Sequence, residues 1–468
     1  MRKKGQNVTS PAAPIDDFDT TTQRLTGRAG LALFSRYLTS TGFLGAMSIL
    51  FASMRKSGKG IRIGSLLRQI LLFMADGTSR HMTYFDELRG DTGYAGVIET
   101  PASDMVSSHQ VKRFFAGCSV GRQWLFRRLI KDIFVWRLRV KKPDIIVLGI
   151  DTMVMDNSEA DVREGVQPTY KHGVKGFQPL HVTWGKYIVD AVFRGGKKHS
   201  NHGTTVLTTT THLVELIRRR YRDVPILFRM DAGFFDQKIM AHLEDLGVGY
   251  LVGGKIYGDL RERVDALTPE IWQTFESGAR KEEGSAWNYC ALDDCRKSWN
   301  QARAAIFMRK TIERRQRLLP FAQTESVIYT NVLRGTPFAD ALLVAGLAAY
   351  LDADALIRLY HDRGADELVH RALKDFAVEE LPFKRFAANA AFYYMTLVAF
   401  ALFEAFREDV VGETTSYATR VRRRLIDVAA KIVRTGHRTI IKITEAASRT
   451  LDFRTLWYRS AHGPPFVV

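Results

Sequence analysis

Three acidic residues, two at the ends of apolar runs and one in a helical segment, are candidates to form one cluster of carboxylates. Asp151 and Asp231 each end a short apolar run, "DIIVLGID" and "PILFRMD", and such runs are typical of buried strands. Glu367 lies in "YHDRGADELVHRALK", residues 360–374. Oxygen ligands without sulfur or imidazole suit Mg²⁺ or Mn²⁺ rather than zinc. Two such ions could activate an attacking oxygen and stabilise a leaving one in phosphoryl transfer. Asp151 would then bridge both ions, and Asp231 and Glu367 would each hold one.

The segment around Glu367 places further polar residues along one helical stripe. At about 100° per residue, this stripe contains Tyr360, Arg363, Glu367 and Lys374. Core contacts are expected on the opposite side, from Leu368, Val369, Ala372, Leu373 and Phe376. Glycine is unfavourable inside a helix by roughly 1 kcal/mol. We therefore expect the helix to begin near Gly364, with Tyr360 and Arg363 just before its N-terminal end.

Each acid taken alone has an ordinary structural role open to it. Asp151 could cap the turn after its strand, and Asp231 could shape the "MDAGFF" turn. Glu367 could be a solvated helix carboxylate paired with Arg363 or Arg371. The three acids together, in this order on two strands and a helix, favour the catalytic role.

The elements that must position these acids follow an α/β order. Over residues 143–256 three strands are followed by a helix, a strand, a helix and a strand. Both aspartates fall at strand ends, where open sheets place their sites. Residues 257–326 are charged and contain Trp272, Trp287 and Trp299, and we read them as a β-rich insertion. Residues 327–406 complete the core with the Glu367 helix.

Helical sequence flanks this core on both sides. Residues 1–27 predict a disordered basic arm, residues 28–142 a helical DNA-binding domain, and residues 407–468 a basic helical C-terminal region. Ser107 and Ser108 are candidate N-caps in the first helical region. The run 386–403 carries no charge and just reaches the length of a membrane span. Because it contains Asn389 and stands alone, a buried core helix is favoured over a membrane span.

The distribution of charge points to a polyanionic partner. The net charge is +18, and residues 1–150 carry 23 Lys and Arg against 11 Asp and Glu, while residues 407–468 carry 12 against 6. The excess avoids the middle of the chain, which plain solubility would not require, and nucleic acid is the commonest polyanion. The candidate phosphate contacts in the N-terminal region are Lys112, Arg113, Arg127 and Arg128. A solvated cationic helix face is the alternative for each of them.

Two further observations bear on the surroundings of the chain and of the site. The three cysteines form no disulfide framework and no paired zinc-binding spacing, which fits a reducing cytoplasm. "GGKKHSNHG" carries His199 and His202 beyond a strand edge. We expect these two to be loop residues, with phosphate contact as the alternative.

Taken together, these motifs resemble the DDE transposases of bacterial insertion sequences. Tyr360, Arg363, Glu367 and Lys374 match the Tyr-x2-Arg-x3-Glu-x6-Lys signature of one group at every spacing. "GID" at 149–151 and "RMDAGFF" at 229–235 are similar to its first and second acidic motifs, and the likeness extends over nearly the whole chain. Ala232 departs from the serine that many relatives have after the second aspartate.

The resemblance implies a fold, a chemistry and a set of roles. The fold would be α/β, a ribonuclease-H-like catalytic core of mixed sheet and flanking helices with a β-rich insertion. Asp151, Asp231 and Glu367 would be catalytic metal ligands for two Mg²⁺ or Mn²⁺ ions, and Tyr360, Arg363 and Lys374 would contact DNA near the scissile phosphate. A tryptophan of the insertion could stack on an extruded base.

The function implied is DNA cleavage at transposon ends followed by strand transfer into target DNA. The partners would be double-stranded DNA, both terminal inverted repeats and target, and a second copy of the chain in a homodimer that cuts in trans. No membrane is expected, and the location would be the bacterial cytoplasm, at the nucleoid. Two alternatives stay open: an inactive or domesticated sequence-specific DNA-binding protein, and a ribonuclease-H-like nuclease without strand transfer.

Overall fold

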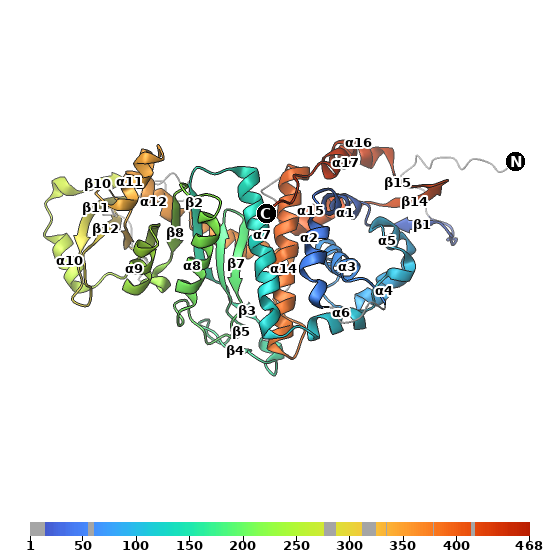
Figure 1. The fold of residues 1–468 in the computed structure, drawn as a ribbon, viewed down its shortest axis with the longest axis horizontal. Helices are drawn as coiled ribbons and strands as arrows, with labels where there is room; N and C mark the ends of the chain where they lie inside the picture. The colour runs from blue at the N-terminus through green and yellow to red at the C-terminus, as the bar shows by residue number, and fades with distance from the viewer. Residues whose placement is uncertain are drawn as a thin grey trace.

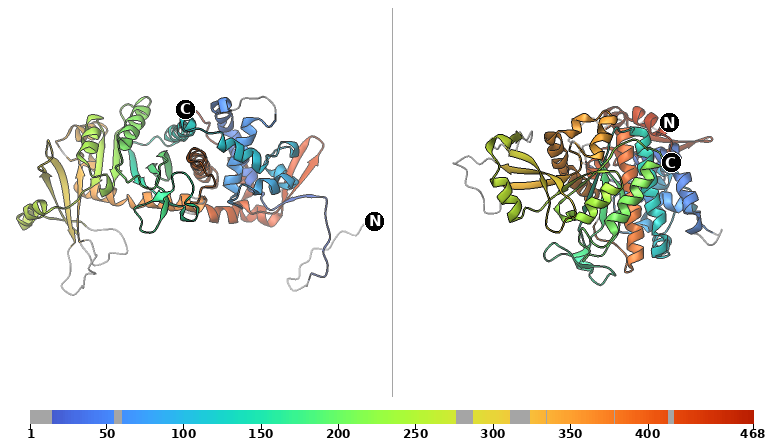
Figure 2. Two further views of the ribbon diagram at one scale, coloured as in Figure 1. Left: turned by 90° about the horizontal axis from the view of Figure 1, so that it is seen from below. Right: turned by 60° about the vertical axis from the view of Figure 1, so that its left-hand side comes forward.

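The computed structural model describes residues 15–54, 60–275, 287–310, 324–333, 335–377, 379–412 and 417–468. It is a mixed α/β structure, elongated, with a helical region at one end and a sheet that runs to the other (Figures 1 and 2). Asp151, Asp231 and Glu367 belong to the central part.

The central feature is a nine-stranded sheet with strand order β10-β11-β12-β13-β9-β8-β2-β6-β7. Its first five strands in the chain are β2 (Ile146–Thr152), β6 (Leu180–Trp184), β7 (Tyr187–Val192), β8 (Ile226–Met230) and β9 (Gly249–Gly253). β2, β8 and β9 are parallel, and β6 is antiparallel to both β2 and β7. The strands β2, β7, β8 and β9 therefore all end at the same edge of the sheet.

The two faces of the sheet are covered by different helices. α8 (Thr205–Arg218) and α9 (Gln237–Asp245) pack on the face that carries Phe228 and Tyr250. α11 (Pro337–Val344) and α12 (Ala353–His361) pack on the opposite face, against Leu227 and Leu251. This alternation along β8 and β9 is what a strand buried on both faces requires, and it agrees with the apolar runs in the sequence.

The segment after β9 extends the same sheet. It contains α10 (Gly258–Asp265), β10 (Gln273–Phe275), β11 (Trp287–Asp294), β12 (Arg303–Lys310) and β13 (Glu325–Thr330). β13 pairs with β9, with Tyr329 opposite Val252. A separate small sheet, β3 (Met155–Asp156), β4 (Gln167–Pro168) and β5 (Lys175–Phe177), lies between β2 and β6 in the chain and was not predicted.

Seven α-helices precede the sheet in the described part of the chain. They are α1 (Leu31–Ser40), α2 (Phe43–Leu50), α3 (Ile63–Asp76), α4 (Tyr84–Gly90), α5 (Thr92–Val97), α6 (Ser108–Ala116) and α7 (Gln123–Lys141). The predicted start of α6 is confirmed, because Ser107 and Gln110 form a reciprocal capping box. α7 packs against β7 and against α14 (Phe386–Phe406), so the two long helices stand side by side between the sheet and the smaller helices (Figure 1).

The apolar run 386–403 forms most of α14. The helical stretch Phe386–Val411 is long and apolar enough to cross a membrane by length and composition, yet 89% of its most apolar window is buried inside the protein. Asn389, the polar residue that weighed against a membrane span, is fully buried and exchanges two hydrogen bonds with the backbone of Phe383. In this structure α14 is a core helix.

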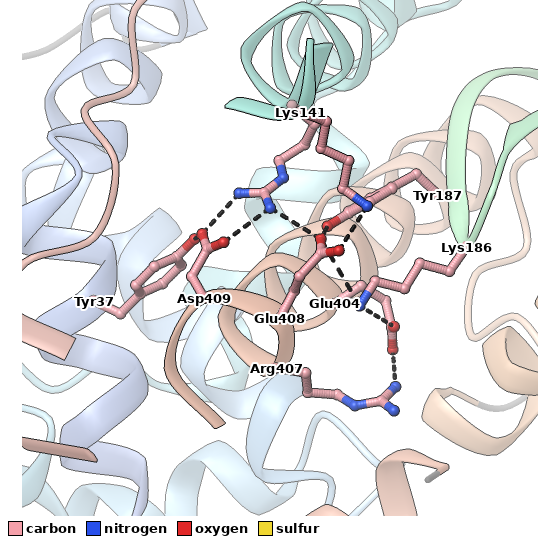
Figure 3. A network of polar contacts seen from close by, with 9 residues as sticks. Tyr37, Lys141, Lys186, Tyr187, Glu404, Arg407, Glu408 and Asp409 are labelled. Carbon is pink, nitrogen blue, oxygen red and sulfur yellow. Dashed lines mark hydrogen bonds and ion pairs between the residues drawn. The ribbon is translucent and has the colours of Figure 1, made fainter. Parts of the chain in front are cut away.

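A polar network at the end of α14 joins the helical region to the sheet (Figure 3). The guanidinium of Arg137, on α7, is almost fully buried and forms ion pairs with Glu408 at 2.9 Å and Asp409 at 2.7 Å. Tyr37 of α1 donates to Asp409, and Tyr187 of β7 donates to Glu408. One cluster of charges therefore connects α1, α7, β7 and the turn after α14.

The C-terminal region departs from the all-helical prediction. α15 (Ala418–Val421) is short, and the chain then forms the hairpin β14 (Ala430–Thr435) and β15 (Arg438–Ile443) before α16 (Glu445–Thr450) and α17 (Phe453–Ala461). β14 also pairs with β1 (Arg24–Thr26), so the predicted disordered arm of residues 1–27 is wrong at its end; residues 1–14 lie outside the described residues. β-branched residues on both sides of Gly436, which has φ +59°, favour the hairpin.

Candidate active site

Asp151 and Asp231 lie side by side at one edge of the sheet. β2 and β8 are parallel, and Ile150 is paired with Met230, so each aspartate is one residue beyond the same rung. Neighbouring strands are about 4.8 Å apart, which places the two carboxylates on adjacent strands at the same level. The sequence prediction that two strands deliver these two acids to one place agrees with this arrangement.

The surroundings of Asp151 disfavour its negative charge. Its pKa is raised from 3.8 to about 6, first by burial and then by the negative charges of Asp231 and Asp366. The Thr152 amide, which donates to the Asp151 carboxylate at 2.7 Å, and the positive charge of Arg363 act in the opposite direction. Two carboxylates that repel one another in a partly buried place would be stabilised by a bound cation.

Tyr360 and Arg363 lie beside this pair, at a break between two helices. α12 ends at His361, and α13 (Gly364–Phe376) begins at Gly364, which agrees with the predicted start. The Tyr360 hydroxyl sits so close to Gly253, at the end of β9, that a side chain there would overlap it. Burial raises the pKa of Tyr360, Arg363 lowers it, and Asp231 raises it. Both side chains thus lie within electrostatic reach of an aspartate, Tyr360 of Asp231 and Arg363 of Asp151.

Asp366, which the sequence reading missed, fixes the start of α13 against the sheet. Its carboxylate accepts from Arg229 Nη2 and from Thr183 Oγ1, each at 2.9 Å. It occupies the space above Gly149, where a side chain would collide with it. The other Nη of Arg229 donates to the Leu359 carbonyl at the end of α12. A charged residue inside the apolar run "PILFRMD" was the signal that a buried partner exists.

Glu367 lies on the same side of the site but stays exposed. The pKa of the Tyr170 phenol is raised by partial burial and by the charges of Asp151, Asp231 and Glu367, so all three acids lie within electrostatic reach of this ring. Among the described residues, however, no group of three His, Cys, Asp or Glu side chains is arranged to hold a metal ion. The neighbouring Leu368 is 51% exposed, and its prediction as a core contact is wrong because Asp366 takes the inward position.

The fourth signature residue has internal partners. Lys374 donates to Glu379 at 2.8 Å and to the Val154 carbonyl at 3.2 Å. It lies two turns beyond Glu367 on α13 and lowers the pKa of His370 rather than that of Asp151. The structure therefore brings Tyr360 and Arg363 to the aspartates and places Lys374 further along the same helix.

The predicted N-terminal contacts differ in their exposure. Lys112 and Arg113 are exposed on α6, and Arg128 is exposed on α7 with only a loose ion pair to Asp132 at 3.6 Å. Arg127 instead forms a bidentate ion pair with the fully buried Asp190 of β7, from Nε to Oδ1 at 3.0 Å and from Nη2 to Oδ2 at 2.7 Å. That guanidinium joins α7 to the sheet, so the prediction of Arg127 as a DNA contact conflicts with its structural role.

Comparison with known families decides the broader identity. Residues 17–461 match the family model described as transposase DDE domain, group 1. This chain belongs to the DDE transposase family. A search of curated proteins found no match.

Within this transposase a buried chain of polar rings leads inward from Asp151. His370 Nδ1 lies 3.9 Å from the Asp151 carboxylate, and His370 Nε2 lies 2.9 Å from His181 Nδ1. The other nitrogen of His181 contacts the Tyr393 hydroxyl of α14. Burial lowers the pKa of His370 to about 4, so the ring is neutral at pH 7 and supports Asp151 by packing rather than as an ion pair. No spacing in the sequence marked these three residues.

Proposed function

We propose that this transposase cuts DNA at the ends of a mobile element and transfers the strands into target DNA. The observation that carries the proposal is the pair Asp151 and Asp231, each one residue beyond the paired Ile150 and Met230, with the pKa of Asp151 raised to about 6. The order β9-β8-β2-β6-β7 with an antiparallel β6 supports a ribonuclease-H-like core. Family membership supports the transposase role.

The donor set fits Mg²⁺ or Mn²⁺. Mg²⁺ is usually bound through one or two carboxylates, with phosphate oxygens and water completing its shell, and Asp151 and Asp231 are such a pair. Glu367 would join them as the third ligand in a two-ion site. When bound, the ions would supply positive charge to the attacking and leaving oxygens of a phosphoryl transfer. The like-charge repulsion at Asp151 is the property that a divalent cation would remove.

The chain's own cations would hold the DNA strand. Arg363 can bind a phosphate through two N–H groups, and Tyr360, tucked against β9 beside it, can donate a hydrogen bond or stack. Lys374 would reach a neighbouring phosphate once its ion pair with Glu379 is replaced by a contact with DNA. Lys112, Arg113 and Arg128 would bind the transposon end farther from the cut. A homodimer that cuts in trans, acting at the bacterial nucleoid, completes the proposal.

The decisive experiment is nicking of a DNA fragment that carries the chain's own coding sequence with its flanks. Wild type should nick at the borders only with Mg²⁺ or Mn²⁺, while Asp231→Ala should bind DNA but not nick it. Nicking that survives Asp231→Ala would refute the assignment. Products joined to a supercoiled plasmid separate a transposase from a nuclease, and binding without nicking by wild type would favour the inactive DNA-binding protein.

A further inference from the structure

A cationic loop, residues 194–203, leaves the sheet at the same edge as the two aspartates. β7 runs parallel to β2, because both are antiparallel to β6, so its end lies at the Asp151 edge. The loop contains Arg194, Lys197, Lys198, His199 and His202 and no acidic residue. It is the "GGKKHSNHG" segment whose histidines had phosphate contact as an alternative.

The loop packs directly on the turn that follows Asp231. A side chain at Gly233 would come 3.0 Å from both the Asp231 carboxylate and the Ser200 hydroxyl, so these groups flank the same small space. Asn201 donates to the Asp236 carboxylate at 2.7 Å, on the far side of that turn. The loop is therefore fixed at the rim of the acidic pair rather than free in solution.

Arg194, at the base of the loop, is a buried cation with no counter-ion among the described residues. Arg194 is only 6% exposed, and its Nε donates to the Gln178 carbonyl at 3.1 Å. In the described part of the chain neither Nη atom has a hydrogen-bond partner. Burial lowers its pKa to about 10, with no carboxylate acting to raise it. A buried guanidinium left unpaired is unfavourable and calls for an anion nearby.

Three more features of the loop favour an anion at the same place. Lys198 Nζ lies 2.8 Å from His202 Nε2, so two basic groups converge. The pKa of His202 is lowered by partial desolvation and by the positive charges of Lys198, His199 and Arg194, all of which repel a second proton. The 14-residue helix α8 begins directly after the loop, and its N-cap Thr204 makes no side-chain capping bond, which leaves its first N–H groups for an anion.

We propose that the cationic loop binds a backbone phosphate of the DNA strand next to the one positioned at Asp151 and Asp231. This inference rests on the proposed function, because it takes DNA to be the substrate. Lys198 and His202 would contact the phosphate, and Arg194 would supply the uncompensated charge beneath them. Phosphates would then be held on both sides of the acidic pair: by Arg363 on the α13 side and by the loop on the β7 side.

The test measures DNA affinity against salt in the full chain carrying Asp151→Asn, in EDTA, so that no cleavage occurs. With a DNA duplex of about 30 base pairs, each lost phosphate contact should make the negative slope of log K against log salt shallower by about 0.9. Lys198→Ala and Arg194→Gln should each show this loss and bind about three- to tenfold more weakly near 150 mM KCl. Arg222→Ala is the charge-matched control, because Arg222 is exposed and precedes β8, at the edge opposite Asp231.

Folding and ligand source are separated by two further measurements. Arg194→Gln removes an unpaired buried charge, so its melting temperature should not fall; a fall would assign Arg194 to the fold and overturn its role here. Inorganic phosphate should displace the duplex no more than KCl of equal ionic strength, and stronger displacement would make this a free-phosphate site. Equal slopes for Lys198→Ala and Arg222→Ala would refute the phosphate contact of the loop. Metal-dependent nicking by the unmutated chain would then still support the proposed function.

Discussion

Replacing Asp366 by alanine should release the start of α13 from the sheet. The side chains of Arg229 and Asp366 are only 9% and 5% exposed, and their ion pair is 2.9 Å long. In Asp366→Ala the Arg229 guanidinium would stay buried with the Leu359 carbonyl as its remaining partner. Removing one member of a buried pair typically destabilises by about 3–5 kcal/mol. Glu367 follows Asp366 directly, so the loss should disorder the third acidic position first.

Hydrogen exchange followed by mass spectrometry can read this effect locally. Peptides covering residues 353–376 should exchange at least about 10²-fold faster in Asp366→Ala, since 1.4 kcal/mol corresponds to a factor of about ten. The double variant Arg229→Met/Asp366→Leu should recover much of the protection, because an apolar pair replaces a buried ionic one at little cost. Asp161→Ala is the matched control: its ion pair with Lys175 is also 2.9 Å long, but both side chains are about half exposed.

The control pair is solvent-exposed and should contribute little to stability, so Asp161→Ala should leave exchange in its own peptide nearly unchanged. If Asp366→Ala accelerates exchange of residues 353–376 no more than Asp161→Ala accelerates its own, the reasoning about the start of α13 is wrong. It would also be wrong if the double variant were as destabilised as the single one, because the effect would then be lost packing rather than an orphaned charge.

Three further outcomes are expected. The folded pKa of Asp151 is about 6 against an ordinary 3.8, so burial of this carboxylate should destabilise the metal-free protein less as pH falls from about 7 to about 5; the difference in melting temperature between Asp151→Asn and wild type, measured in EDTA, should shrink over this range, and a constant difference would contradict it. Arg137→Met leaves the Glu408 and Asp409 carboxylates without their shared buried partner and should lower urea stability by about 3 kcal/mol or more; a loss below 1 kcal/mol would contradict this. Ser107→Ala breaks the α6 capping box and should cost about 1 kcal/mol, whereas Ser119→Ala, at a helix start without a side-chain cap, should cost almost nothing.

The sequence was informative wherever a residue's role depended on its own neighbours in the chain. Apolar runs ending in aspartate predicted β2 and β8 with their acids, and Gly364 marked the start of α13. Ser107, one of two candidate N-caps, caps α6. In each case the pattern and the structure depend on the same few consecutive residues.

Roles that depend on contacts across the chain could not be read in this way. The polar stripe from Tyr360 to Lys374 was drawn on one continuous helix, although a helix start was expected near Gly364; the break after His361 separates Tyr360 from the faces of α13. Asp366 was therefore overlooked and Leu368 was assigned to the core. Arg127 has the sequence context of a surface cation, and only its distance to Asp190, 63 residues away, assigns it to the fold. The hairpin β14–β15 was missed because its basic composition favoured a helix.

The pairing of β13 with β9 makes the insertion difficult to remove by protein engineering. A deletion from α10 to β13 would strip three backbone rungs, such as Tyr329 opposite Val252, from a strand whose flanking residues are apolar. β9 would become a bare edge of the central sheet, and unprotected edges of this kind recruit strands from other molecules. A shortened transposase core would thus be expected to aggregate, unless β9 were first given charged or proline residues at its new edge.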